Sequence, residues 1–201
     1  MSLLRQANFL LRITRSHGIV RRYFVVNGFD GALTMLGLII GFLISTPTEL
    51  PVIINACLGA AIALGVSGVS SAYISEAAER QHALNLLEDA MVTSLQNSAH
   101  GKAARWVPML IAGVNGSSPL IISLLILSPL WLSQAGIAMP LPPLYMAITI
   151  ALTLIFLLGV FLGRSTGGSW LRSGTQTLLV AVVTAALIYS VCGVISSVTN
   201  N

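Results

Sequence analysis

The sequence predicts an all-α polytopic membrane protein with five transmembrane helices. Of its 201 residues, 55% are hydrophobic and only 8% are charged, whereas soluble proteins carry about 25% charged residues. Five separate stretches are long and apolar enough to cross a bilayer, which takes about 20 residues. These observations exclude a soluble domain, a disordered chain, a coiled coil and a secreted disulfide scaffold. We therefore expect a multi-pass protein of a cell (inner or plasma) membrane or an organelle membrane, with the lipid bilayer as its surroundings.

The predicted spans follow one another along the chain. The first has Asp30 as its only charged residue, and the other four have none. Pro119 and Pro129 are expected to kink the third span, because proline removes a helical hydrogen bond. In chain order the spans are residues 24–44, 51–74, 107–132, 143–162 and 174–198.

The basic residues predict the orientation of these spans. With five spans, all ten lysines and arginines fall on one side of the membrane. The connections between spans one and two and between spans three and four contain none, nor does the C-terminal tail. Positively charged loops stay in the cytoplasm, so we expect a cytoplasmic N-terminus and a C-terminus outside.

Two regions outside the spans are predicted to form further helical segments. Residues 1–22 predict a basic amphipathic segment, followed by a single five-helix membrane domain over residues 23–201. On a helix its arginines would share one face, near anionic head groups; alternatively, the segment only sets the topology. Residues 75–95 contain neither Gly nor Pro, which favours a cytoplasmic helical extension of the second span within residues 75–105. The arginines of the shared face are Arg5, Arg12, Arg15 and Arg22.

Asp30 is the sharpest functional signal in the sequence. It lies roughly 9 Å into the first span at 1.5 Å per residue, where a carboxylate is costly and usually functional. The alternative is a structural ion pair with Arg21, Arg22 or another basic group. Polar and small residues recur around it at steps of three or four, so this face must meet protein or water rather than lipid. The face consists of Asn27, Asp30, Gly31, Thr34, Gly37 and Gly41.

A weak internal repeat adds Asn115 to this candidate site. Residues 28–32 of the first span resemble residues 113–117 of the third, and paired glycine-interrupted segments point to transporter binding sites. Asn115 is therefore predicted to help Asp30 hold an ion. The small residues of the second span, by contrast, predict close helix packing.

A second candidate site lies in the predicted cytoplasmic extension. Glu76 and Glu79 are three residues apart, and His82 falls near their helical face. Two carboxylates and an imidazole suit a divalent metal. The alternative is an ordinary ion pair between Glu76 and Arg80, four residues later.

The sequence contains no catalytic constellation. A P-loop, an H-E-x-x-H motif and a G-x-S-x-G motif are all absent, so we do not expect an enzyme. Cys57 and Cys192 form no metal-binding pattern. Because the basic residues are explained by topology, nucleic acid is not an expected partner.

The motifs resemble those of the vacuolar iron transporter (CCC1-like) family. The similarity rests on D-G-x-x-T-x-x-G, which begins at Asp30, and on Y-x-S-E-x-x-E, which begins at Tyr73. It implies a homodimeric exporter that moves ferrous iron, and often manganese, out of the cytosol in exchange for protons. It further implies that Asp30 carries metal and protons, and that Glu76 and Glu79 collect the metal. The chain departs from the family at residues 67–72, which lack the methionine and glutamate that other members carry there.

Taken together, the sequence predicts a secondary transporter of ferrous iron or manganese, driven by proton antiport. The metal is cargo, and no tightly bound cofactor is expected. Asp30, Asn27, Thr34 and Asn115 would form the transport site, with Glu76, Glu79 and His82 as metal ligands at the cytoplasmic mouth. The alternatives are a non-transporting membrane scaffold or assembly subunit, and a transporter of a small organic solute.

Overall fold

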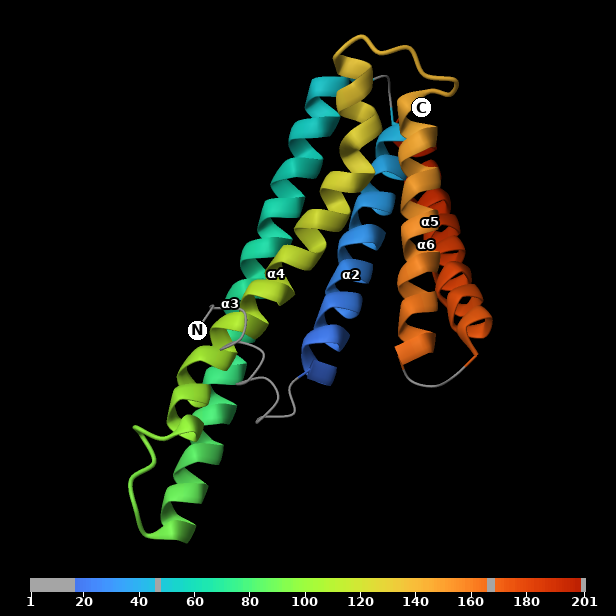
Figure 1. Cartoon of the computed structure of the whole chain (residues 1–201). Coiled ribbons are helices and arrows are strands. Elements are labelled where there is room, and N and C mark those ends of the chain that lie inside the picture. The colour runs from blue at the N-terminus through green and yellow to red at the C-terminus, as the bar shows by residue number, and fades with distance from the viewer. Residues whose placement is uncertain (1–16, 46–47, 166–168, 200–201) are drawn as a thin grey trace. The chain divides into compact units, whose positions relative to one another are not determined.

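The computed structural model describes residues 17–45, 48–165 and 169–199, and over these residues it contains helices and no strand (Figure 1). All five helices are long and apolar enough to cross a membrane, so the protein is a multi-pass integral membrane protein, as predicted. Most of the predicted N-terminal segment, including Arg5, Arg12 and Arg15, lies outside the described residues. The helices are α2 (His17–Ile44), α3 (Leu50–Met91), α4 (Ala99–Gln134), α5 (Pro143–Ser165) and α6 (Trp170–Thr199).

The helices extend beyond the predicted spans, mainly at the ends that carry basic residues. α2 begins at His17 rather than at residue 24, and α4 begins at Ala99 rather than at residue 107. Hydropathy reports only the part of a helix that fits the hydrocarbon core, while backbone hydrogen bonding lets the helix continue past it. α3 continues from its apolar part to Met91 without a break.

α4 runs unbroken from Ala99 to Gln134 although it contains several prolines. Pro129 has no N–H to donate to the carbonyl of Leu125, one turn earlier. The hydroxyl of Ser128 donates to that carbonyl instead, at 2.7 Å. A side chain of the helix thus replaces a missing backbone hydrogen bond where no water is at hand, as membrane helices with proline require.

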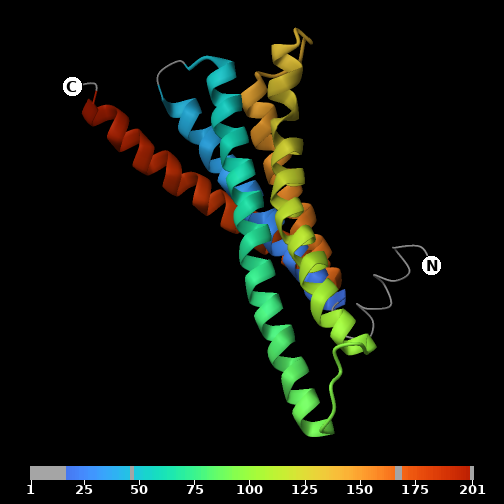
Figure 2. The ribbon, with the colours of Figure 1, turned by 90° about the vertical axis from the view of Figure 1, so that its left-hand side faces the viewer.

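The chain forms two compact units. The first contains the residues up to Phe24 together with Gly65–Ser117, and the second contains Val25–Leu64 together with Ser118–Asn201. In the first unit the later part of α3 lies beside the beginning of α4, and a short turn joins them (Figures 1 and 2). The apolar core of this unit includes a cluster of Ala103, Val107 and Ile111 of α4, against which Ile19, Val20 and Tyr23 of α2 pack.

The turn between α3 and α4 is held by the last turn of α3. The carboxylate of Glu88 accepts a hydrogen bond from the backbone N–H of Leu95 at 2.7 Å. Gly101 lies so close to the carbonyls of Leu95 and Gln96 that a side chain would not fit there. Immediately after α3, Val92 adopts a φ of 50°, although its side chain is β-branched and 91% exposed.

In the second unit, α2 packs closely on α4 through glycine. A Cβ atom at Gly31 would lie 2.8 Å from the Cα of Pro119, and one at Gly28 would lie 2.9 Å from the hydroxyl of Ser118. Such small residues let helix backbones approach in a membrane, where no hydrophobic force drives helices together.

The helices α5 and α6 form an antiparallel pair in the same unit (Figure 1). Gly159 of α5 lies against Thr177 of α6, whose hydroxyl donates to the carbonyl of Ile155 at 3.2 Å. Most apolar side chains of α6 are exposed on the surface of the chain. In a bilayer, such a surface can meet lipid tails without cost.

Replacing Val92 with glycine should stabilise the turn between α3 and α4. The left-handed conformation costs a residue with a Cβ about 1–2 kcal/mol, and the added backbone freedom of glycine offsets about half of this. We expect Val92→Gly to raise the unfolding temperature of the purified protein, and Val92→Ala, which keeps the Cβ, to have no such effect. A lower unfolding temperature for Val92→Gly would contradict this account of the turn.

Replacing Gly31 with alanine should disrupt the contact between α2 and α4. Backbone atoms of Pro119 would have to move to make room for a methyl group, and overpacking of this kind costs about 1–3 kcal/mol. Gly41→Ala is the matched control, because nothing lies within 4 Å of a Cβ at that position. Thermal unfolding in detergent should separate the two variants. Equal stability of both would show that the glycine contact is unimportant.

Candidate functional site

Asp30 lies in the middle of α2, and its side chain is exposed on the surface of the chain. It is one of the residues that line a cavity of about 300 Å³ in the second unit. No described residue of this unit forms a hydrogen bond or an ion pair with its carboxylate. Helices α2, α5 and α6 supply the lining, which consists of Val25, Val26, Phe29, Asp30, Gly159, Leu162, Gln176, Thr177 and Val180.

Gln176 of α6 is a polar residue of this cavity that the sequence analysis did not identify. Its side chain is exposed, like that of Asp30. The other polar lining residue of α6, Thr177, donates its hydroxyl to backbone carbonyls of Ile155 and Gly174. The sequence does show that Gln176 is a polar residue near the start of an apolar span, and this is the signal that could have identified it. Its proximity to the cavity of Asp30 arises from the packing of α6 and has no counterpart in local sequence.

Asn27 and Thr34 occupy the helical face of Asp30, as their spacing predicted. Both are half-buried. The hydroxyl of Thr34 donates to the backbone carbonyl of Asp30 at 2.8 Å, a common arrangement for threonine inside a helix. Its proton is therefore held within α2, while its oxygen can still accept a hydrogen bond or approach a cation.

Asn115 serves a helix contact in the first unit. It is only 4% exposed, and its side-chain amide donates to the carbonyl of Gly68 in α3 at 2.7 Å. Its neighbour Gly116 lies against Val69 and the carbonyl of Gly65, where a Cβ would overlap both. The structure thus gives Asn115 a packing role at the crossing of α3 and α4.

The three predicted cytoplasmic ligands of α3 differ in their surroundings. Glu76 is 8% exposed, whereas Glu79 and His82 are exposed. One carboxylate oxygen of Glu76 lies 3.5 Å from the Nε of Arg80, and the other lies 3.5 Å from the hydroxyl of Tyr23. The ion pair that the sequence left open as an alternative is therefore present.

Within residues 17–45, 48–165 and 169–199, no three His, Cys, Asp or Glu side chains are grouped closely enough to hold a metal ion. A metal bound at this part of α3 would thus need a rearrangement of Glu76, Glu79 and His82, or further ligands. Backbone oxygens and water are such ligands for hard divalent ions.

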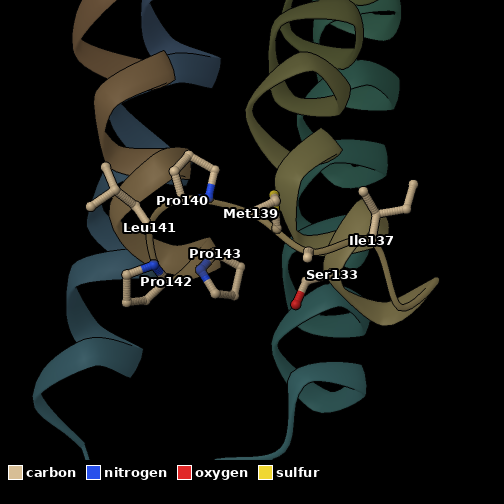
Figure 3. A pocket seen from close by; sticks show the side chains of 8 residues that line it. Ser133, Ile137, Met139, Pro140, Leu141, Pro142 and Pro143 are labelled. Atoms are coloured by element: carbon tan, nitrogen blue, oxygen red, sulfur yellow. The ribbon is translucent and has the colours of Figure 1, made fainter.

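A second cavity, of about 370 Å³, lies at the connection between α4 and α5 (Figure 3). Ser133 lines it from the end of α4, and Pro142 and Pro143 line it near the start of α5. No charged residue lines it, and we assign it no role. Its remaining lining residues are Ile137, Ala138, Met139, Pro140 and Leu141.

Comparison with known proteins finds a relative that aligns with most of this chain. No protein-family model and no solved structure matches the chain. The chain is 31% identical over 173 residues to the uncharacterized protein MJ0645 of Methanocaldococcus jannaschii. The aligned region covers 85% of this chain and 87% of the archaeal protein, so most of each chain takes part in the similarity.

Asn115 should contribute to stability through its amide. In Asn115→Asp, a carboxylate oxygen would replace the donor and face the Gly68 carbonyl inside the helix contact. A buried unsatisfied or charged group of this kind costs about 2 kcal/mol or more. Asn85→Asp is the control, because exposed Asn85 accepts a hydrogen bond from Gln81 and an aspartate can do the same. The unfolding temperature should fall for Asn115→Asp and stay unchanged for Asn85→Asp. An unchanged unfolding temperature for Asn115→Asp would refute the packing role.

Proposed function

The chain belongs to the family of MJ0645 of Methanocaldococcus jannaschii, and we propose that it is a secondary transporter exporting ferrous iron or manganese from the cytosol in exchange for protons. The observation that carries this proposal is the position of Asp30. Its carboxylate lies in the middle of a membrane-crossing helix, beside a cavity, and no described residue of its unit pairs with it. Carboxylates at such depth are costly unless they bind an ion, a proton or water.

In the proposed mechanism, the Asp30 carboxylate binds either the metal ion or a proton. The two occupants exclude each other, so protonation from one side releases the metal and deprotonation on the other side restores the site. Oxygens of Asn27, Thr34 and Gln176 would complete the coordination, because ferrous and manganous ions accept carboxylate, carbonyl and water oxygens. Gln176 extends the site from α2 to α6.

The cytoplasmic end of α3 supplies the proposed entry site. Glu79 and His82 are exposed there, and Glu76 lies one turn before Arg80. Negative charge at the mouth of a pathway raises the local concentration of cations. The resemblance to the vacuolar iron transporter family supports the same assignment for Glu76 and Glu79, and it also supports a homodimer.

The distribution of basic residues supports the proposed orientation. In the second unit, Arg164 lies in the last turn of α5 and Arg172 near the start of α6. The described residues of the connections at the other ends of the helices, 48–49 and 135–142, contain no Lys or Arg. By the positive-inside rule, this arrangement favours a cytoplasmic N-terminus and an external C-terminus.

A non-transporting membrane subunit is the second candidate. It is favoured by Asn115 and Glu76, because Asn115 joins α4 to α3 and Glu76 joins α3 to Tyr23 of α2 through hydrogen bonds. In that case Asp30 would meet a polar partner from another protein. A transport measurement on the purified chain distinguishes the two functions.

Asp30→Asn should abolish proton-coupled metal flux while leaving the fold intact. The amide cannot exchange a metal for a proton, and the exposed position of residue 30 tolerates the change. The measurement is entry of Mn²⁺ or Fe²⁺ into liposomes containing the purified chain, with and without a pH gradient. Wild-type protein should need the gradient, and the variant should fall to the rate of empty liposomes.

Glu49→Gln is the matched control for this experiment, because it also replaces one carboxylate with an amide. Glu49 is exposed and lies just before Leu50, the first residue of α3, whereas the proposed entry residues lie from Glu76 onward. Size-exclusion profiles and thermal unfolding would establish that all variants are folded. Wild-type flux in Asp30→Asn, or no flux from folded wild-type protein, would refute the proposed function.

A further inference from the structure

In the cytoplasmic part of α3, the positively charged side chain of Arg80 contacts Glu76, which is a proposed metal ligand. We propose that Arg80 is an internal counter-cation, which occupies the Glu76 carboxylate until a divalent metal ion displaces it. This inference rests on the proposed function, since it concerns how the entry site binds and releases its cargo. It assigns Arg80 as a specificity-determining residue.

The contacts of Glu76 support an exchangeable pair. The carboxylate is almost fully buried in the first unit, and a buried charge of this kind requires a partner. Arg80 approaches one oxygen to 3.5 Å and the Tyr23 hydroxyl approaches the other to 3.5 Å. Charge-assisted hydrogen bonds of full strength are about 2.7–2.9 Å long. Arg80 thus neutralises the carboxylate and the Tyr23 hydroxyl orients it, and both contacts are longer than a hydrogen bond of full strength.

Charge decides which ions can take the place of Arg80. A guanidinium and a metal ion at one carboxylate repel each other. A metal ion can therefore displace Arg80 only if its electrostatic attraction to Glu76 is stronger than that of Arg80. A monovalent ion has the same charge as Arg80 and lacks its connection to the helix. A divalent ion attracts the carboxylate twice as strongly. Arg80 therefore favours divalent over monovalent ions, and it lowers the affinity for the divalent ion.

Lower affinity is useful at an entry site. Conduction needs binding that is favourable enough for an ion to enter and weak enough for it to leave. When the metal leaves, Arg80 returns to Glu76, so the buried carboxylate is not left without a positive partner. The neighbouring exposed Glu79 and His82 can hold the ion during this exchange.

The test is Mn²⁺ binding by the purified full chain in detergent, measured from the electron paramagnetic resonance signal of free Mn²⁺. Removing the charge in Arg80→Gln should tighten binding about tenfold, within the range of typical coupling between two sites. Excess Na⁺ should compete more effectively in this variant than in wild type. Arg80→Lys, which keeps the charge, should restore the wild-type affinity and selectivity.

Three further variants make the result specific. Arg80→Met keeps the apolar stem of the side chain and should tighten binding like Arg80→Gln, so the outcome does not depend on the folding of one variant. Adding Glu76→Gln to Arg80→Gln should remove the gain. Arg105→Gln is the matched control, because Arg105 is exposed and donates to Gln96 rather than to an acidic residue; its affinity should equal that of wild type.

The outcomes separate this inference from the proposed function. Unchanged or weaker Mn²⁺ binding in folded Arg80→Gln and Arg80→Met would overturn the role of Arg80, even if the wild-type protein transports metal. Tighter binding in both variants, without flux from wild-type protein, would support the counter-cation and refute transport. A purely structural ion pair would lower stability on removal of Arg80, and it would not change the preference for Mn²⁺ over Na⁺.

Discussion

Close approach of α4 to its neighbours is the constraint on which both units of this protein depend. In a bilayer, apolar side chains gain nothing by leaving lipid for protein, so helices associate through tight packing and hydrogen bonds. Gly31 of α2 meets Pro119 of α4 in the second unit, and Gly65 and Gly68 of α3 meet Asn115 and Gly116 of α4 in the first. Each contact exists because one partner lacks a side chain.

This constraint also divides the polar residues of the membrane region into two kinds. Asn115 uses its amide on the Gly68 carbonyl, and Thr177 uses its hydroxyl on the carbonyl of Ile155. These groups are satisfied within the protein and serve packing. Asp30 and Gln176 are exposed beside a cavity. The difference in surroundings, rather than polarity itself, is what marks Asp30 and Gln176 as candidates for ion binding.

The sequence predicts the number and order of the helices because apolar length is a local property. It does not predict where α2 and α4 begin, since hydropathy falls at the membrane surface while the helices continue to His17 and Ala99. At the candidate site, sequence alone indicates Asp30 and the neighbours on its own helical face. It cannot indicate Gln176, which reaches the same cavity through the packing of α6. For Glu76, spacing allows both a metal ligand and an ion pair with Arg80, and only the three-dimensional contacts show that the pair forms.

The contact between Gly31 and Pro119 has a consequence for biosynthesis. Of the five spans, α2 has the lowest hydropathy, and it is the first to leave the ribosome. The helix that covers its glycine face, α4, is made only after the whole of α3 and the turn that follows it. During that interval the face of α2 that carries Gly28 and Gly31 meets lipid or the insertion machinery in place of α4. The contact that holds α2 in the second unit can therefore form only once α4 has been made.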